Sequence, residues 1–318
     1  MRKKLIIIIF FVIFYSLNVS AEVKQKISIE TANLKTISEI FKSQNIKKNK
    51  KISGNLYLPS ENNRYPLVIL QHGTGSINNL KKTISEMKKL FLSKKIALFV
   101  ADSYGGRGTK KVSTASRLYD SLMILNTFQN NKNIDKSKIY FVGMSYGGYV
   151  AQLVNNATLF NKVNKELIPF KGIVGIYPSC TLQWENQKLI SPMMFILGKK
   201  DNWTNPAACT ELISRIKNQS LNVTINEYDG HHGWMLDGKK KTLSDTWKDN
   251  VENCGTGRID DQGYFSWGGS SEKKSGWSGF INGLKQKKCY SKGVTIEPSD
   301  NLRTKTINAV LDFILSSS

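Results

Sequence analysis

The sequence predicts an α/β fold in which a mostly parallel central sheet is covered by helices on both faces. From about residue 51 onward, short β-rich segments alternate with segments of helical spacing. This order is typical of parallel strands joined by crossover helices. Several predicted strands are continuous apolar runs, such as "LVILQ" at 67–71, and such runs indicate burial on both faces of the sheet.

The expected elements follow one another without repeats or low-complexity tracts. Segment 52–59, "ISGNLYLP", alternates like a half-exposed strand, and a turn at "NNRYP" leads into the buried strand 67–71. A helix is expected over 80–92, where apolar residues recur at helical spacing. The other expected elements are the strand 96–101, a helix from about 114 to 128, the strands 138–142, 172–177, 192–197 and 222–228, and a last helix at 301–315.

The N-terminus has the order of a secretory signal peptide. A basic start is followed by an apolar run from Leu5 to about Leu17 and by small residues ending at Ala21. The run is shorter than the roughly 20 residues that span a bilayer, so a signal peptide over 1–21 is favoured over a retained anchor. We therefore expect export, to the periplasm or the medium, and one α/β domain over 22–318.

The chain has four cysteines, Cys180, Cys209, Cys254 and Cys289. An even number in an exported chain favours disulfides over thiol chemistry. Pairing Cys180 with Cys209 and Cys254 with Cys289 is favoured because each pair brackets one local segment, although the two other pairings stay open. The sequence has no CxxC or HxxxH spacing, so we expect no metal site and no cofactor.

The formal net charge is +22. The lysines are spread along the chain in pairs, which is typical of a solvated surface. Because no recognition motif accompanies this charge, we expect no specific nucleic-acid partner and at most weak association with anionic surfaces.

Four predicted strands end in polar or glycine-rich segments, and the carboxyl ends of parallel strands meet at one edge of a sheet. These segments are "QHGTGS", "GMSYGG", "GKKDNW" and "DGHHGW". In chain order they supply backbone donors, a serine, an aspartate and a histidine, which is the order of an α/β-hydrolase triad.

Ser145 is the candidate nucleophile. It lies between a predicted strand and a predicted helix, and Gly143, Gly147 and Gly148 remove the side chains that would clash in a sharp turn. The usual oxyanion donors would be the amide after the nucleophile, here Tyr146, and one in "HGTGS", for which Thr74 is preferred and Gly75 is the neighbour.

The base and the acid follow the serine in the chain. His72 precedes Ser145, so the base is His231 or His232, and His232 is preferred because glycine and tryptophan follow it. Three loop aspartates are candidates for the acid. Asp229 and Asp237 each precede a glycine and are explained as turn residues. Asp201 lies directly after a buried strand, while the next helix has its own start signal in Asn205 and Pro206, so Asp201 is preferred.

Six segments of the chain carry a resemblance to a known family: "HGTGS", "DSYGGRG", "RLYDSLMIL", "GMSYGG", "GKKDNW" and "HHGW". Over about 52–234 and the last helix, the chain resembles the dienelactone hydrolase family of α/β-hydrolases. The resemblance implies an α/β-hydrolase fold and a triad of Ser145, Asp201 and His232. It also implies that "DSYGGRG" lies near the site, with Arg107 facing it or else lying on the surface, and His231 is a further candidate for the lining.

Two features depart from this family. Its founding enzymes, which cleave dienelactones, carry a cysteine nucleophile where this chain has Ser145, and this chain is basic with an export signal. The resemblance therefore implies a serine hydrolase that cleaves a small-molecule carboxylic ester or related acyl bond through an acyl-enzyme. The alternatives are a serine peptidase of the same fold and a non-catalytic basic binding protein that retains the fold.

The stretch of about 244–292 is long for a loop and rich in tryptophan, glycine and serine. Its aromatic residues and the expected Cys254–Cys289 bond indicate an ordered excursion. We hypothesise that it lies over the site and shapes the substrate pocket; the alternative is a packed surface lobe.

Overall fold

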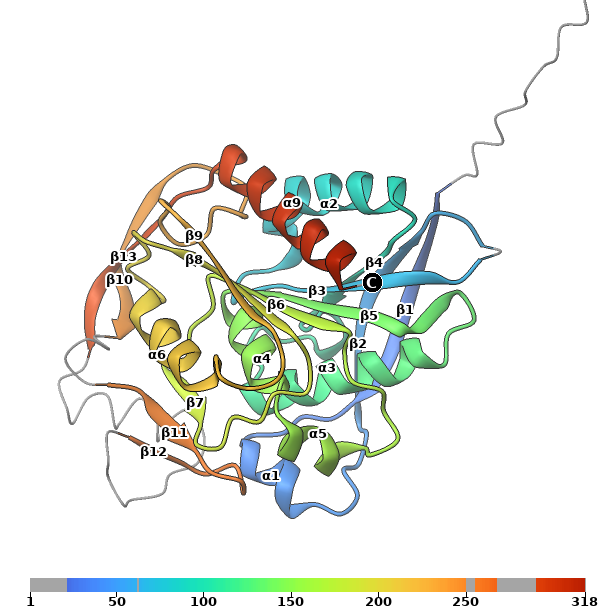
Figure 1. The fold of residues 1–318 in the computed structure, drawn as a ribbon, viewed down its shortest axis with the longest axis horizontal. Helices are drawn as coiled ribbons and strands as arrows, with labels where there is room; N and C mark the ends of the chain where they lie inside the picture. Colours follow the sequence, from blue (N-terminus) through green and yellow to red (C-terminus); the bar gives the residue numbers. More distant parts are fainter. Residues whose placement is uncertain (1–21, 62, 250–254, 268–289, 318) are drawn as a thin grey trace, which may run out of the picture.

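The computed structural model describes residues 22–61, 63–249, 255–267 and 290–317. Its main sheet has eight strands in the order β1-β2-β4-β3-β5-β6-β8-β9 (Figure 1). Their bounds are β1 Val23–Thr31, β2 Lys50–Leu58, β3 Tyr65–Gln71, β4 Ala97–Asp102, β5 Ile134–Met144, β6 Gly172–Ile176, β8 Met193–Gly198 and β9 Val223–Tyr228. The strands from β4 to β9 are parallel, so the α/β class and the mostly parallel sheet are confirmed.

The sheet separates two apolar cores. Along β3, Leu67 and Ile69 belong to one core while Val68 and Leu70 belong to the other, because successive side chains of a strand point to opposite faces. Helices α2 and α9 cover one face, and α1, α3, α4, α5 and α6 cover the other (Figure 1). The helices are α1 Ile37–Lys42, α2 Lys81–Ser93, α3 Thr114–Gln129, α4 Tyr146–Val154, α5 Ala157–Val163, α6 Pro206–Ile216 and α9 Asp300–Ser316, with 3₁₀ turns η1 Ile77–Leu80 and η2 Gly105–Arg107.

The edge formed by β1 and β2 is antiparallel, and β1 was absent from the sequence-based prediction. Strand β1 pairs with β2, which pairs in turn with β4, in both cases antiparallel. The first six residues of β1 alternate between half-buried and exposed positions, and only Ile29 and Thr31 are buried. An edge strand this polar gives a weak sequence signal.

The excursion predicted at about 244–292 falls partly within the described residues. β10 Lys241–Asp249 pairs with β13 Tyr290–Ile296, and β11 Gly257–Ile259 lies between β12 Phe265–Trp267 and β7 Leu182–Trp184. The side chains of Ile259, Phe265 and Trp267 are buried in the α3 and α4 core. This part is a packed lobe, whereas the proposed contact of 244–292 with substrate is not tested and stays a prediction.

One of the two expected disulfides is present. Cys180, just after β6, is bonded to Cys209 in α6, and both residues are fully buried. The pairing of Cys254 with Cys289 lies outside the described residues, as does the signal peptide over 1–21. Within the ranges that the structure describes, no helix has both the length and the apolarity to cross a membrane.

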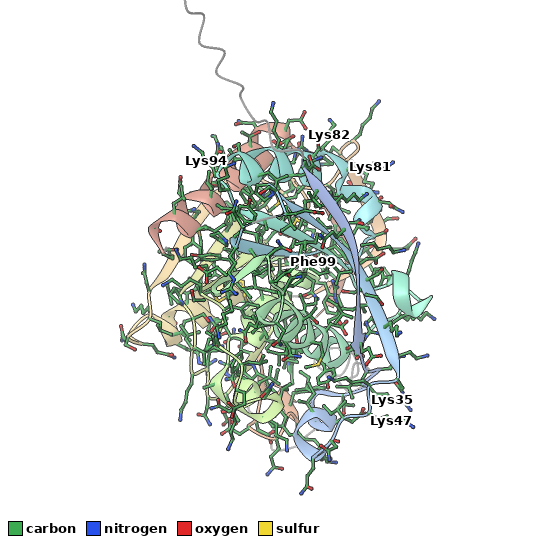
Figure 2. The ribbon with its side chains drawn as sticks, turned by 90° about the vertical axis from the view of Figure 1, so that its right-hand side faces the viewer. Lys35, Lys47, Lys81, Lys82, Lys94 and Phe99 are labelled. Carbon is green, nitrogen blue, oxygen red and sulfur yellow. A yellow bond between two sulfur atoms is a disulfide. The ribbon has the colours of Figure 1, made fainter. Side chains whose placement is uncertain are left out.

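The positive charge is carried on the outside of the molecule. Figure 2 shows the labelled side chains Lys35, Lys47, Lys81, Lys82 and Lys94 at the periphery, and all five residues are exposed. The labelled Phe99 on β4 lies inside with no exposed surface. This distribution is typical of a solvated basic surface around an apolar core.

Candidate active site

Ser145 occupies a sharp turn between β5 and α4. Its φ of 53° and ψ of −115° lie outside the regions that L-residues favour. The turn is possible because its neighbours lack side chains: a Cβ on Gly143 would lie 2.0 Å from the carbonyl oxygen of Gly147, and one on Gly147 would lie 2.4 Å from that of Gln71. The chain therefore holds the serine at the carboxyl end of β5 with its hydroxyl projecting from the sheet.

The structure brings Ser145, His232 and Asp201 into one chain of hydrogen bonds. Nε2 of His232 lies 2.9 Å from Oγ of Ser145, and Nδ1 of the same ring lies 2.7 Å from Oδ2 of Asp201. His232 is 2 % exposed and Asp201 is 5 % exposed. The carboxylate thus faces one ring nitrogen while the other is left to exchange a proton with the serine.

Asp201 is itself fixed by the loop that follows β8. Its Oδ1 accepts the backbone amides of Trp203 and Thr204, both at 2.9 Å, and its Oδ2 accepts the hydroxyl of Thr204 at 2.8 Å. Together with the bond from His232, these contacts use the four acceptor positions of the carboxylate. The acid is held in one orientation before any substrate arrives.

The His232 loop is supported from two sides. The rings of Tyr177 and Trp203 lie 4.8 and 4.9 Å from the imidazole, centroid to centroid. On the backbone side, the carbonyl of His232 accepts the amide of Glu297 at 2.9 Å, directly after β13. The strand that ends the 244–292 excursion therefore braces the histidine loop.

The other candidates for acid and base have different partners. Asp229 forms an exposed ion pair with Lys200 at 2.7 Å. The carboxylate of Asp237 accepts the amides of Lys81 and Lys82 and so caps α2. His231 is half-buried, with its Nε2 3.7 Å from Oε2 of Glu297. Of these candidates, Asp201 and His232 are the two that the structure brings into hydrogen-bonded series with Ser145.

The two predicted oxyanion donors lie on either side of the serine. Tyr146 is the first residue of α4, where helix amides have no partner within the helix. On the other side, the β3 loop reaches Ser145 so closely that a Cβ on Gly73 would lie 3.0 Å from the serine Cβ. Thr74 follows directly, so its amide belongs to the peptide that joins it to Gly73.

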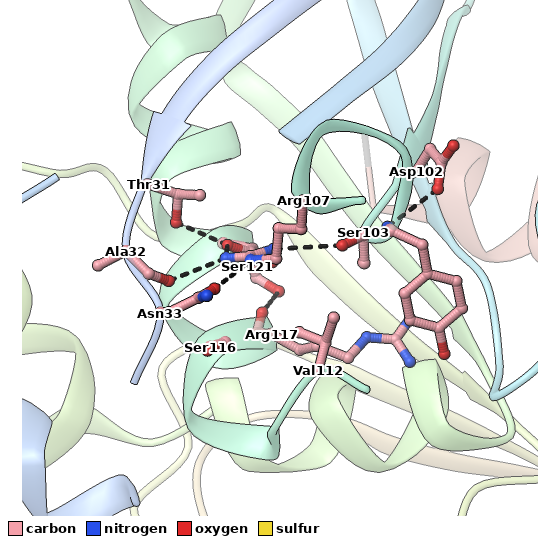
Figure 3. A network of polar contacts seen from close by, with 12 residues as sticks. Thr31, Ala32, Asn33, Asp102, Ser103, Arg107, Val112, Ser116, Arg117 and Ser121 are labelled. Atoms are coloured by element: carbon pink, nitrogen blue, oxygen red, sulfur yellow. Dashed lines mark hydrogen bonds and ion pairs between the residues drawn. The ribbon is translucent and has the colours of Figure 1, made fainter. Parts of the chain in front are cut away.

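The expectation that Arg107 faces the site is wrong. Its guanidinium is enclosed and pairs with both oxygens of Asp120, at 2.6 and 2.7 Å, where neither side chain has exposed surface. Asn33 and the carbonyls of Ala32 and Ser103 accept its remaining N–H groups (Figure 3). Because all five donors of the guanidinium are engaged, Arg107 has none to offer a substrate.

Sequence reasoning missed two residues behind the β3 loop. Arg117 on α3 is fully buried and donates to the carbonyls of His72 and Gly73. His72, 1 % exposed, accepts the amide of Ser103 at Nε2, 3.2 Å away, and lies with Nδ1 2.7 Å from the Gly73 carbonyl. An arginine inside an otherwise apolar helix segment was the available signal for the first of them.

Fold and site together define the chain as an α/β-hydrolase, with a serine in the nucleophile turn and a histidine and an aspartate after it. The model of the dienelactone hydrolase family matches residues 52–254, and the chain belongs to this family. It is accordingly an ester-cleaving hydrolase. A comparison with curated protein sequences finds no significant match.

Several solved structures are similar to this chain at low sequence identity. A Pyrococcus furiosus esterase is 17 % identical over 66 % of this chain and 84 % of its own, with a TM-score of 0.49. A hyperthermophilic esterase from Pyrobaculum calidifontis is 14 % identical over 67 % and 78 %, with a TM-score of 0.48. A dienelactone hydrolase-like promiscuous phosphotriesterase from metagenomic libraries is 11 % identical over 66 % and 84 %, with a TM-score of 0.49.

Proposed function

We propose that this chain is an exported serine hydrolase that cleaves a small-molecule carboxylic ester through an acyl-enzyme on Ser145. His232 acts as the base and Asp201 orients it, while the amides of Tyr146 and Thr74 bind the oxyanion. The reaction uses these side chains and amides without a cofactor.

In the first half of the reaction, Oγ of Ser145 attacks the ester carbonyl carbon and His232 Nε2 takes the serine proton. The negative charge that develops on the carbonyl oxygen is stabilised by amides fixed in place beforehand. The protonated imidazole then gives its proton to the leaving alcohol, and the acyl group stays on Ser145. A water molecule, deprotonated by His232, releases the acid in the second half.

The observation that carries this proposal is the unbroken set of hydrogen bonds from Asp201 through His232 to Ser145, at 2.7 and 2.9 Å. A serine hydroxyl is a weak nucleophile near neutral pH, so such a base within hydrogen-bond reach is what the chemistry requires. The strained backbone of Ser145 supports the same role, because non-glycine residues at positive φ are concentrated at functional sites.

The test is a panel of p-nitrophenyl esters, thioesters and lactones, with Ser145→Ala as the blank. Turnover of at least one ester should fall by about 10⁴-fold or more in Ser145→Ala, since the nucleophile is removed. A fluorophosphonate probe should label the native protein and fail on the same variant. Equal turnover by both proteins, or labelling that survives the substitution, would contradict the assignment.

Adding aminoacyl amides and a binding measurement with anionic vesicles to this experiment separates the two alternatives. A serine peptidase of this fold would also be labelled but would cleave aminoacyl amides in preference to short acyl esters. A basic binding protein would resist labelling and instead bind anionic vesicles or polymers with an affinity that falls steeply with salt. Because the N–H groups of Arg107 are already hydrogen-bonded within the protein, we expect the substrate to be recognised without this arginine.

Export is the second part of the proposal. It is supported by the signal-like segment 1–21 and by the buried Cys180–Cys209 bond, because disulfides persist mainly in oxidising compartments. Sequencing the N-terminus of protein made with its own leader should give Glu22 as the first residue. An intact N-terminus on protein that stays with the cytoplasmic fraction would overturn it.

A further inference from the structure

Arg117 is an unusual buried charge because its hydrogen bonds go to backbone carbonyls. The residue lies in the middle of α3 with 0 % exposure. Nη2 donates to the carbonyl of His72, and Nη1 donates to the carbonyl of Gly73 at 3.2 Å. One rigid, planar group thus holds two consecutive carbonyls of the loop after β3.

His72 holds the second of these carbonyls as well. Its Nε2 receives the amide hydrogen of Ser103, so that nitrogen is the acceptor and Nδ1 carries the proton. Nδ1 therefore donates to the carbonyl of Gly73 at 2.7 Å. Burial and the nearby Arg117 charge lower the pKa of His72 to about 4, so the ring is neutral and this arrangement is kept at ordinary pH.

These two donors fix the direction of the amide that follows. In a trans peptide the carbonyl and the N–H point to opposite sides, so anchoring the Gly73 carbonyl toward Arg117 turns the Thr74 N–H away from it. Gly73 itself presses against Ser145, where a Cβ would lie 3.0 Å from the serine Cβ and 3.5 Å from its Oγ. The Thr74 amide thus directly follows the residue that packs against the nucleophile.

Arg117 also touches the residue that supplies the other amide. Its guanidinium lies 4.7 Å from the centre of the Tyr146 ring and 5.8 Å from that of Tyr104. The hydroxyl of Tyr104 in turn donates to the carbonyl of Thr74 at 2.9 Å. A single side chain therefore contacts both elements that provide the proposed oxyanion donors.

Among the residues that the structure describes, no carboxylate forms an ion pair with Arg117. Asp120, one turn further along α3, accepts from Arg107 with both of its carboxylate oxygens. A positive charge that binds a peptide carbonyl polarises that peptide, and its N–H becomes a stronger donor, since hydrogen bonds in a chain reinforce one another at low dielectric. The same charge favours an anion on the far side of the loop.

We propose that Arg117 is a positioning residue for the oxyanion hole: it aligns and polarises the Gly73–Thr74 peptide so that the Thr74 amide stabilises the tetrahedral intermediate. This rests on the proposed function, in which Thr74 is one of the two donors. Arg117 acts through the loop and does not touch the substrate.

The test compares Arg117→Met with the matched control Arg303→Met. Arg303 is also a buried arginine on a helix, at 1 % exposure, but it pairs with Glu86 and Asp300 between α2 and α9. Both variants lose a buried guanidinium and are expected to lose stability. Only Arg117→Met should lower kcat per folded molecule, on the order of 100-fold, while KM stays within about threefold, because the interaction is made in the transition state.

A trifluoromethyl ketone ester analogue supplies the decisive readout, since its adduct with the serine carries the oxyanion. Its affinity should weaken in Arg117→Met by about the same factor as kcat, and it should be unchanged in Arg303→Met. If Arg117→Met does not fold, Arg117→Lys is measured instead: it keeps the charge but cannot bridge two carbonyls, and kcat and analogue affinity should both fall at least tenfold.

The inference is overturned if the folded Arg117 variant keeps wild-type kcat and analogue affinity, or if KM and kcat change together. Failure of the proposed function gives a different result. In that case the wild-type protein itself would be no more active than Ser145→Ala and would not bind the ketone.

Discussion

The carboxylate of Asp201 and the imidazole of His232 are joined at 2.7 Å, with the aspartate on the Nδ1 side and Ser145 on the Nε2 side of the ring. The bond selects the tautomer whose Nε2 is free to accept a proton. Asp201→Asn keeps the shape of the side chain but can place an amide N–H against Nδ1, which favours the wrong tautomer. We expect kcat to fall by about 10⁴-fold in this variant.

The measurement is ester hydrolysis at neutral pH, with thermal unfolding followed in parallel. Asp229→Asn is the matched control, because this carboxylate is exposed and pairs with Lys200 instead of the histidine. Its activity should stay within about twofold of the native protein. Equal activity of the two asparagine variants would show that Asp201 does not serve as the acid.

The buried pair of Arg107 and Asp120 should contribute to stability through the cost of breaking it. Arg107→Met leaves the Asp120 carboxyl in the protein interior without its guanidinium, and burial already raises the pKa of that carboxyl. Removing one partner of a fully buried ion pair costs about 3 to 5 kcal/mol. Urea unfolding at pH 7 should register a loss of this size.

The double variant Arg107→Met with Asp120→Leu serves as the control. It should recover part of the loss, because no unpaired charge stays behind in the apolar surroundings. A double variant less stable than either single variant would instead mean that the two side chains stabilise the fold separately. Asp120 would then act through its bond with Thr31, and Arg107 through its bond with Asn33.

The spatial arrangement of the proposed triad could be predicted from the sequence because it depends on local order. Ser145, Asp201 and His232 each follow the end of a parallel strand, so they meet at one edge of the sheet. The strands themselves can be recognised from their apolar patterns. Arg107 and Arg117 show the limit. "DSYGGRG" drew attention to Arg107 as an exposed loop residue, whereas the partner that encloses it lies on α3.

The enclosure of α3 explains why Arg117 was missed. This helix is buried on nearly all sides by neighbours that include β1, the strand whose polar pattern concealed it. A helix surrounded in this way cannot be distinguished from a one-sided amphipathic helix until its neighbours are placed. The sequence signal for such a buried helix is a pair of charged residues, Arg117 and Asp120, three positions apart within a largely apolar stretch.

The Cys180–Cys209 bond is expected to stabilise the loop and helix that flank Asp201. It closes a segment of 29 residues between the end of β6 and α6. In the chain-entropy model a loop of this length contributes about 3 to 4 kcal/mol. Replacing both cysteines by alanine, which leaves no new buried polar group, should lower the free energy of unfolding by about that amount.

Guanidinium unfolding of the oxidised proteins measures this effect. Adding reductant to the double alanine variant reports the contribution of the other cysteines separately. If the double variant unfolds at the same denaturant concentration as the native protein, the bond constrains a region that unfolds independently of the sheet.

His72 should make the fold sensitive to mild acid. Its pKa is lowered from 6.5 to about 4, mainly by burial and then by the neighbouring Arg117, against smaller opposing effects of the Gly73 backbone hydrogen bond and of Asp102. In the unfolded chain His72 therefore becomes protonated near pH 6.5, whereas in the native state it becomes protonated only near pH 4. The free energy of unfolding should fall through this window by about 3 kcal/mol and level off below it.

Urea unfolding of the native protein and of His72→Gln between pH 7 and pH 4 isolates this contribution, because all other groups titrate in both proteins. The difference between the two stability curves should shrink as the pH falls, since only the native protein is losing the His72 contribution. Protonation of Nε2 would in addition break the hydrogen bond that this nitrogen accepts from the Ser103 amide. Two curves that run parallel over the whole range would mean that the ring reaches solvent and titrates as it does in the unfolded chain.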